Sequence, residues 1–167
     1  MELYLFRHGI SVDRGTPGYK LDSERPLTPK GEQKIWSISD GLLSQGVSFD
    51  LILTSPYIRA QKTAEILAKV FMAEKKVKHS TNLAPAADPE ELVAEINLVY
   101  AGAKQIVLVG HEPFLSDLAS TLLTGDADLS MTIKKGGICK LTVAGLRYGR
   151  CAKLEWLLAP RQLKKLG

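Results

Sequence analysis

Four polar residues have side chains that suit the transfer of a phosphoryl group. Arg7 and His8 directly follow an apolar run at the start of the chain. Arg59 lies in the first turn of an expected helix, and His111 follows a second apolar run. A guanidinium binds phosphoryl oxygens through a bidentate fork and keeps its charge. A neutral imidazole, with an unperturbed pKa of about 6.5, is a competent nucleophile near neutral pH. These residue types predict a phosphate site with histidine chemistry.

Each of these residues also has an ordinary structural explanation. A single histidine at the end of a strand is often a loop residue with satisfied hydrogen bonds. Arg59 is less easily explained, because a cation in the first turn of a helix opposes the helix macrodipole. A bound anion would reverse that penalty and would also accept the free backbone N–H groups of the turn. The convergence of all four side chains, rather than any one of them, favours a phosphate site.

Metal binding is the competing use for histidine side chains. The chain has three histidines, His8, His79 and His111, and no two of them have the close spacing of metal ligands. His79 falls within an expected strand at residues 77–83, and neighbouring arginines would repel a cation. We therefore expect neither a metal nor another cofactor.

Apolar runs and helix caps alternate along the chain and predict its fold. Strand patterns cover residues 1–6, 51–53, 77–83, 106–109, 138–143 and 153–157. Helices are expected to begin at Thr28, Ser55 and Asp88, each followed by proline, and after Pro113. Strands that alternate with helices favour right-handed crossovers and a sheet covered on both faces. We expect a three-layer α/β/α fold with a mostly parallel central sheet.

The four side chains would then meet at one edge of the sheet. Ligands bind beyond the carboxyl ends of the strands in an open parallel sheet. Expected strands end just before His8 and His111, and a third leads into the helix whose first turn carries Arg59. The intervals between these residues are filled by expected secondary structure, which leaves no room for a lid domain. An open site of this kind suits a phosphoryl group displayed on a protein.

Length and composition restrict the class of protein. With 167 residues, 45% hydrophobic and 24% charged, the chain suits one domain spanning residues 1–167. It has no apolar run long enough for a transmembrane helix and no signal-peptide pattern, so we expect a cytoplasmic protein. Its two cysteines suggest reduced core residues. The net charge of +4 includes no dense basic stripe, which disfavours nucleic-acid binding.

Four motifs carry a resemblance to a known family. They are Arg7-His8-Gly9, the segment 25–31 (RPLTPKG), the segment 55–65 (SPYIRAQKTAE) and the segment 110–113 (GHEP). In this order they resemble the histidine phosphatase superfamily, which has the phosphoglycerate mutase-like fold. Within it, the chain is similar to the SixA-type phosphohistidine phosphatases. The motifs extend from residue 7 to residue 113, and the last third of the chain adds only a compatible strand pattern.

The resemblance implies a role for each matching residue. His8 would be the nucleophile that forms a covalent phosphohistidine intermediate, without a metal. Arg7 and Arg59 would bind the phosphoryl group, and His111 would stabilise it during transfer. Arg25 would be an accessory contact to the substrate. The substrate would be a phosphohistidine-bearing protein of a phosphotransfer or histidine-kinase system.

Two departures from the family pattern bear on the substrate. The larger mutases carry Asn seven positions after the motif arginine, where this chain has Arg14, so mutase activity is disfavoured. Many members also supply a carboxylic acid from the loop after the third strand. Asp88 is the candidate for this general acid, but its position also makes it a helix cap. Imidazole leaves more readily than an alkoxide and needs less help from an acid.

Two other functions remain open. A small-molecule phosphomonoesterase, acting on a sugar or nucleotide-related phosphate, would require a working acid, so the role of Asp88 separates it from a phosphohistidine phosphatase. A non-catalytic phosphate-binding module could share the fold. Retention of His8 together with both arginines and His111 argues against such a module.

Overall fold

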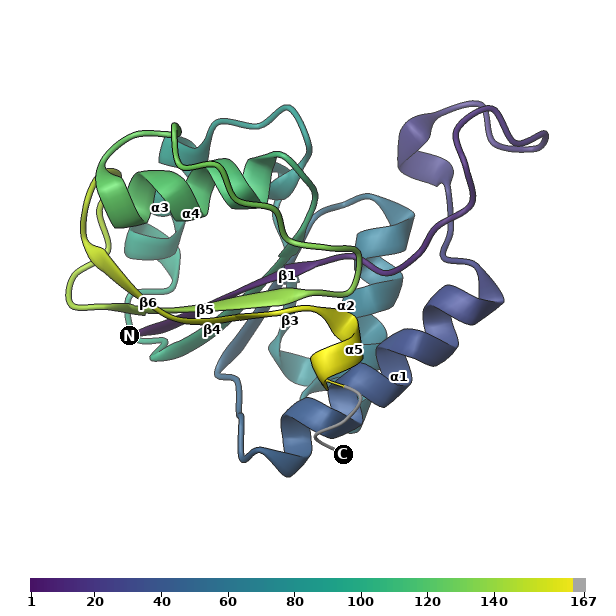
Figure 1. Ribbon diagram of the computed structural model, residues 1–167, viewed down its shortest axis with the longest axis horizontal. Coiled ribbons are helices and arrows are strands. Elements are labelled where there is room, and N and C mark those ends of the chain that lie inside the picture. The colour runs from purple at the N-terminus through teal and green to yellow at the C-terminus, as the bar shows by residue number, and fades with distance from the viewer. Residues whose placement is uncertain (164–167) are drawn as a thin grey trace.

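The computed structural model describes residues 1–163, which form a six-stranded sheet between two layers of helices (Figure 1). The order of the strands across the sheet is β3-β2-β4-β1-β5-β6. The strands are β1 (Glu2–Arg7), β2 (Leu51–Thr54), β3 (Val77–His79), β4 (Gln105–Gly110), β5 (Ile138–Val143) and β6 (Ala152–Leu158). β1, β4, β2 and β3 run parallel, whereas β5 and β6 are antiparallel additions at one side. The predicted mostly parallel sheet is confirmed.

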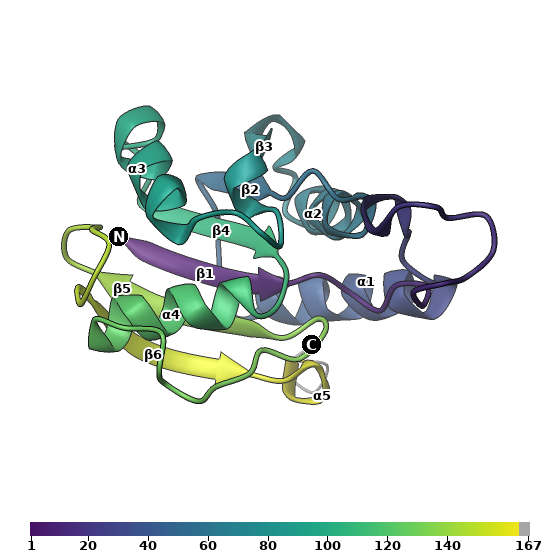
Figure 2. The ribbon, with the colours of Figure 1, turned by 90° about the horizontal axis from the view of Figure 1, so that it is seen from above.

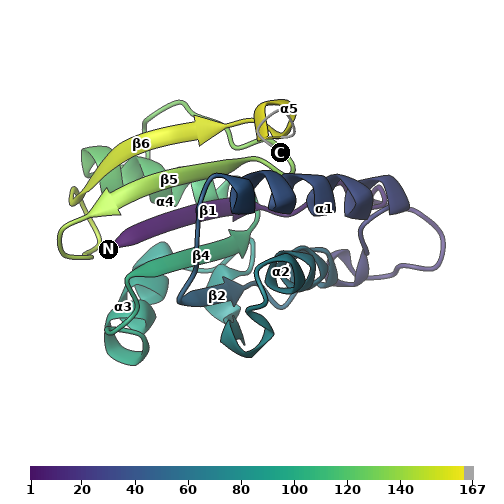
Figure 3. The ribbon, with the colours of Figure 1, turned by 90° about the horizontal axis from the view of Figure 1, so that it is seen from below.

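Helices cover both faces of the sheet. They are α1 (Pro29–Ser44), α2 (Ile58–Val70), α3 (Pro89–Val99), α4 (Phe114–Thr124) and α5 (Pro160–Leu163), with short 3-10 helices at Asp22–Glu24, Glu74–Lys76 and Thr81–Leu83. α3 and α4 lie in front of the sheet when it is seen from above (Figure 2). α1 and α2 lie on the opposite face, seen from below (Figure 3). The predicted three-layer α/β/α arrangement is therefore confirmed.

The central strands are buried on both faces, which explains their continuous apolar sequence. In β1, Leu3 and Leu5 pack in the cluster beneath α3 and α4, whereas Tyr4 and Phe6 pack in the cluster beneath α1 and α2. The residues of β4 alternate between the same two clusters. Successive side chains of a strand point to opposite faces, so one apolar run supplies both cores. This burial fixes the strand ends that carry the polar residues.

Several helix ends follow the predicted caps. The Thr28 hydroxyl accepts a hydrogen bond from the Gly31 amide (3.0 Å), and Pro29 begins α1. The Asp88 carboxylate accepts from the Glu90 amide (2.8 Å) at the start of α3. Gly125 ends α4 with a φ of 106°, a conformation that glycine adopts without strain. Side-chain caps satisfy backbone groups that the first helical turn leaves unpaired.

Two element boundaries differ from the sequence prediction. α2 begins at Ile58 rather than at Ser55, because the Ser55 side chain turns toward His111 and the neighbouring Tyr57 amide. The strand predicted for residues 77–83 ends at His79. It lies at the edge of the sheet and pairs only with β2, and Ser80 then caps a 3-10 helix by accepting from the Asn82 amide (3.1 Å).

Two other expectations can be compared with residues 1–163. None of the helices there combines the length and the apolar character needed to cross a membrane. Cys139 and Cys151 are both free. Burial raises the pKa of the Cys139 thiol to about 12, so this cysteine is an inert core residue.

A glycine near the start of α1 permits a close approach that positions the segment after His8. A Cβ atom at Gly31 would lie 2.1 Å from the carbonyl oxygen of Ile10. We expect Gly31→Ala to lower the free energy of unfolding by about 1–3 kcal/mol, as overpacking does. Urea denaturation measures the change. Gly102→Ala is the matched control, because a Cβ there meets no atom within 4 Å, and its effect should stay within about 0.5 kcal/mol. Equal stability of the two variants would contradict this interpretation.

Candidate functional site

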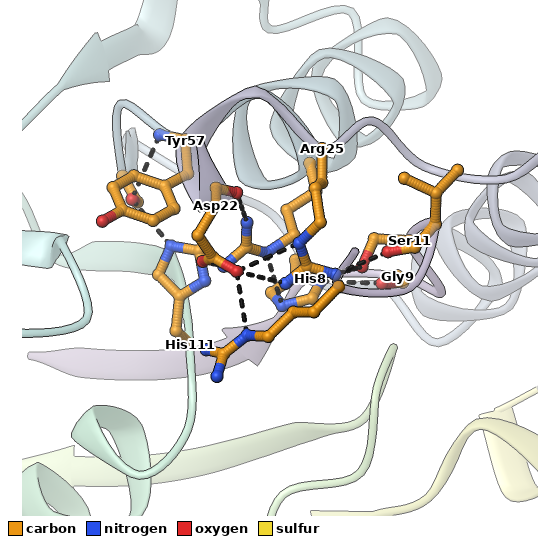
Figure 4. A network of polar contacts seen from close by, with 11 residues as sticks. His8, Gly9, Ser11, Asp22, Arg25, Tyr57 and His111 are labelled. Atoms are coloured by element: carbon orange, nitrogen blue, oxygen red, sulfur yellow. Dashed lines mark hydrogen bonds and ion pairs between the residues drawn. The ribbon is translucent and has the colours of Figure 1, made fainter. Parts of the chain in front are cut away.

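The carboxyl ends of three neighbouring parallel strands bring the predicted residues together. Arg7 ends β1 and pairs with Gly110 at the end of β4, so His8 and His111 emerge side by side. The two imidazole rings lie 5.1 Å apart between centroids. β2 lies on the other side of β4 and leads through Ser55 into α2, whose first turn carries Arg59. Figure 4 shows the cluster that results.

The hydrogen bonds of His8 define which ring nitrogen carries the proton and which carries the lone pair. His8 Nδ1 lies 2.7 Å from the carbonyl oxygen of Gly9, which can only accept. Arg59 Nε donates to His8 Nε2 over 3.1 Å. These partners place the proton on Nδ1 and the lone pair on Nε2. The amide of Gly9 is itself held by the Thr63 hydroxyl (3.1 Å), so the orientation of the ring is fixed from two sides.

Burial keeps both imidazoles uncharged. As whole residues, His8 is 5% exposed and His111 is 2% exposed. Burial, supported by the neighbouring His111 and the two arginines, lowers the pKa of His8 to about 2 against the weaker opposing effect of the Gly9 carbonyl. Burial also lowers the pKa of His111 to about 3, with Arg59 as the next cause. Both rings are therefore neutral at physiological pH, as a nucleophilic imidazole must be.

His111 presents one ring nitrogen to the site. Its Nε2 lies 2.8 Å from the Ser55 hydroxyl, and that oxygen also accepts from the Tyr57 amide (3.3 Å). A Ser55 hydroxyl that donates to Nε2 places the ring proton of His111 on Nδ1. This Nδ1 is buried and has no hydrogen-bond partner within residues 1–163. The edge of His111 also contacts the Tyr57 ring, at 5.0 Å between centroids.

Like His111, Arg7 has a buried nitrogen without a partner. Its Nη1 donates to the carbonyl oxygen of Ile133 (2.8 Å), whereas Nε is buried and unpaired within the described part of the chain. Glu112 balances the charge of Arg7 but accepts its own hydrogen bonds from Ile133 and Ser116. A buried unpaired donor costs about 1–3 kcal/mol. An anion whose oxygens accept from Arg7 and His111 would remove that penalty.

Arg59 is buried despite its unfavourable place at the start of α2. The residue is 3% exposed. Its guanidinium lies over the Tyr57 ring, 4.9 Å from the ring centroid. Its two outer nitrogens donate to Asp22, Nη1 to the backbone carbonyl (2.6 Å) and Nη2 to the carboxylate (2.8 Å). A carboxylate and a neutral imidazole therefore stabilise this cation.

Asp22 is the residue of the site that the sequence did not reveal. One carboxylate oxygen accepts from Arg25 Nε (3.0 Å) and Nη2 (2.6 Å), and the other accepts from Arg59. Partial burial acts to raise the pKa of Asp22, but the hydrogen bonds and charges of Arg25 and Arg59 outweigh it and hold the pKa well below its usual range. The only sequence signal was the spacing of three residues between Asp22 and Arg25.

The remaining predicted residues are placed differently. Arg25 lies in the cluster, but it bonds Asp22 and the backbone carbonyl of Val12 (2.5 Å). Asp88 is exposed, and its carboxylate caps α3. In the described part of the chain it has no hydrogen bond or ion pair with the four central residues, which are Arg7, His8, Arg59 and His111. His79 is exposed on the edge strand β3. Within residues 1–163, no group of three histidine, cysteine or acidic side chains is arranged to hold a metal.

The buried neutral histidines make stability depend on pH. The unfolded chain takes up protons as the pH falls below about 6.5, whereas the folded protein resists protonation of His8 and His111. The free energy of unfolding should therefore decrease on acidification, with a slope that approaches about 1.4 kcal/mol per pH unit for each ring once the unfolded imidazole is fully protonated. Urea denaturation between about pH 6.5 and pH 5 should show a shallower decrease for His8→Asn than for the unmodified protein. Equal slopes would mean that His8 titrates normally in the folded state.

Comparisons with known proteins show which family the chain resembles. The sequence profile of the histidine phosphatase superfamily (branch 1) matches residues 3–84. An uncharacterized protein of Picosynechococcus is 39% identical over 150 residues, which cover 89% of this chain and 86% of that protein. The phosphohistidine phosphatase SixA of Escherichia coli is 25% identical over 166 residues, which cover 98% of this chain and 97% of SixA.

Solved structures share the fold. The protein histidine phosphatase SixA complexed with tungstate has a TM-score of 0.82 at 24% identity, covering 98% of this chain and 99% of that chain. The alpha-ribazole phosphatase of Shigella flexneri has a TM-score of 0.74 at 19% identity, covering 96% and 97%. A phosphoserine phosphatase of Entamoeba histolytica has a TM-score of 0.73 at 16% identity, covering 97% and 98%. With its phosphoglycerate mutase-like fold and these relatives, the chain belongs to the histidine phosphatase superfamily and is a phosphatase.

Proposed function

We propose that this phosphatase hydrolyses phosphohistidine on a partner protein, through a covalent intermediate on His8 and without a metal. The observation that carries the proposal is the lone pair of His8 Nε2, which accepts from Arg59 Nε, in a site where two buried nitrogens lack partners, Arg7 Nε and His111 Nδ1. A phosphoryl group in front of Nε2 would supply acceptors for both. We place the activity in the cytosol, with a protein of a phosphotransfer or histidine-kinase system as the partner.

The first step is attack by His8 Nε2 on the phosphorus atom. The new Nε2–P bond forms as the bond from phosphorus to the substrate nitrogen breaks, and that electron pair goes to the leaving imidazole. His8 then carries a positive charge, which the Gly9 carbonyl stabilises through Nδ1–H. Arg7 and His111 donate to the equatorial oxygens of the transferring group. Donors that are already in place stabilise this charge without reorganisation.

The second step returns His8 to its starting state. A water molecule attacks the phosphorus of phosphorylated His8, and the P–Nε2 bond breaks with its electron pair returning to Nε2. The proton of the water passes to solvent, and inorganic phosphate is released. The low pKa of His8 favours this step, because the neutral ring is the stable form in the folded protein.

Neither Asp22 nor Asp88 is available as a general acid, which favours a nitrogen leaving group over an alkoxide. An alkyl ester needs a proton on its leaving oxygen, and general acid catalysis of this kind contributes about 10² to 10⁴ in rate. Asp88 is engaged as a helix cap, and Asp22 is held ionised by two arginines. Phosphohistidine protonated on its second ring nitrogen leaves as neutral imidazole and requires no acid from the protein.

The surface beside the site is compatible with a protein substrate. An open groove of about 730 Å³ extends from Arg7 and Glu112 along the segment 127–132. Small ligands are generally enclosed to 70–90% of their surface, whereas a side chain displayed on a protein needs only local access. The groove therefore supports a macromolecular substrate.

A small-molecule phosphomonoesterase is the second candidate. Its support is the likeness of fold to the alpha-ribazole and phosphoserine phosphatases. In this case a carboxylic acid must protonate the leaving group, and Asp88 would have to leave its cap.

A substrate panel with a nucleophile variant tests the proposed function. The unmodified protein should release phosphate from a histidine-phosphorylated phosphotransfer protein and from activated aryl phosphates, with sugar phosphates poorer by about 10² to 10⁴ in kcat/KM. His8→Ala should lose all turnover and accumulate no acid-labile, alkali-stable radiolabel, while His79→Ala keeps full activity. Sugar phosphates hydrolysed as fast as phosphohistidine would overturn the proposal in favour of a metabolite phosphatase.

The role of Asp88 can be tested separately with esters of graded leaving-group pKa. We expect Asp88→Asn to leave kcat/KM unchanged across the series, because an asparagine still caps α3. Asp88→Ala removes the cap and should lower the free energy of unfolding by about 1 kcal/mol without a change in selectivity. A loss in Asp88→Asn that grows with the basicity of the leaving group would instead identify Asp88 as the general acid.

A further inference from the structure

Asp22 occupies the part of Arg59 that is best suited to bind a phosphoryl group. The Nε–H and Nη2–H groups of a guanidinium point in the same direction and form the fork that binds two oxygens of one anion. In Arg59, Nε faces His8 Nε2 (3.1 Å) and Nη2 faces the Asp22 carboxylate (2.8 Å). The Asp22 carboxylate and the nucleophilic nitrogen therefore bind the two donors of the same fork, within the cluster drawn in Figure 4.

The same carboxylate also fills the fork of a second arginine. Arg25 directs both Nε (3.0 Å) and Nη2 (2.6 Å) to the other oxygen of Asp22. Arg14 adds a third contact at 3.0 Å, but its side chain is 82% exposed and so contributes little. One internal anion thus fills the fork of Arg25 and takes one of the two donors in the fork of Arg59.

This arrangement is more than a structural requirement of the fold. The side chain of Asp22 is 30% exposed and lies on the segment between β1 and α1, outside both apolar clusters. Arg59 is held by other contacts as well: its guanidinium lies over Tyr57, and Nη1 bonds the backbone carbonyl of Asp22. Neutralising the carboxylate would remove its charge but leave these contacts in place.

We propose that Asp22 is a specificity-determining residue that lowers the affinity of the site for free oxyanions, including the product inorganic phosphate. A bound phosphate must displace the carboxylate from the arginine forks or share them with it, and the two like charges repel at short range. A phosphoryl group carried by a protein gains further contacts around the site, whereas free phosphate gains none. Asp22 would therefore promote release of the product and keep the site open to a protein substrate.

The inference rests on the phosphatase site described above but not on the identity of its substrate. Inorganic phosphate is the product whether the substrate is a phosphohistidine or a phosphate ester. Its binding can be measured directly by calorimetry and as competitive inhibition against an aryl phosphate. A failure of the phosphohistidine proposal would therefore leave this test intact.

The test compares Asp22→Asn with Asp13→Asn, which removes the same charge from the same segment. The Asp13 carboxylate forms no ion pair or hydrogen bond with an arginine within residues 1–163. We expect Asp22→Asn to bind phosphate about tenfold more tightly or better, equivalent to at least about 1.4 kcal/mol. The inhibition constant should decrease in parallel, and Asp13→Asn should match the unmodified protein in both measurements.

Unchanged or weaker phosphate binding by a folded Asp22→Asn protein would overturn the proposal and leave Asp22 as a residue that only positions the arginines. Thermal melting establishes that the variant is folded. Asp22→Ser provides a second variant, which removes the charge with a smaller side chain, and it should tighten phosphate binding in the same direction. Equal tightening in Asp13→Asn would also contradict the proposal, because it would assign the effect to net charge rather than to the forks.

Discussion

The contact between Arg59 Nε and His8 Nε2 is the interaction on which the site depends. It requires a lone pair on Nε2, and the Gly9 carbonyl secures this by holding the proton on Nδ1. A charged imidazole would bring two cations together in a buried position, so the arginine and the low pKa of His8 maintain each other. The end of β1 positions His8 and the first turn of α2 positions Arg59, so the fold brings together two residues that are distant in the sequence.

Each type of side chain in the site has a different charge state. Arginines carry fixed positive charge, imidazoles are kept neutral by burial, and one carboxylate compensates the cations from the mouth of the site. A phosphoryl group that enters meets donors whose positions are already fixed. Preorganised donors of this kind stabilise a transition state more than water can, because they need not reorient during the reaction.

The fold and the convergence of Arg7, His8, Arg59 and His111 at one edge of the sheet could be predicted from the sequence, and the physical reasons are local. Continuous apolar runs identify strands buried on both faces, and residues at their carboxyl ends must converge in a parallel sheet. Asp22 escaped prediction because it lies in an irregular segment with no periodic pattern, and its partner Arg59 is distant in the sequence. The start of α2 was also misplaced, because Ser55 has the pattern of a cap but contacts His111 instead. Contacts made across the fold override local propensity at such positions.

The segment between β1 and α1 is closed at its base by a short neck. Ser11 pairs with Leu27 in an isolated bridge, the Val12 amide donates to Pro26 (3.0 Å), and the Thr28 amide donates to Ile10 (2.9 Å). Residues 13–25 therefore form a loop whose ends are held together independently of its length, and surface loops of this kind tolerate insertion and replacement. A substitution inside the loop, at position 22 for example, can therefore change the charge next to Arg59 while the hydrogen bonds of the neck still hold the chain that follows the nucleophile. The neck thus separates the part of the chain that fixes the nucleophile from the part that sets the charge around it.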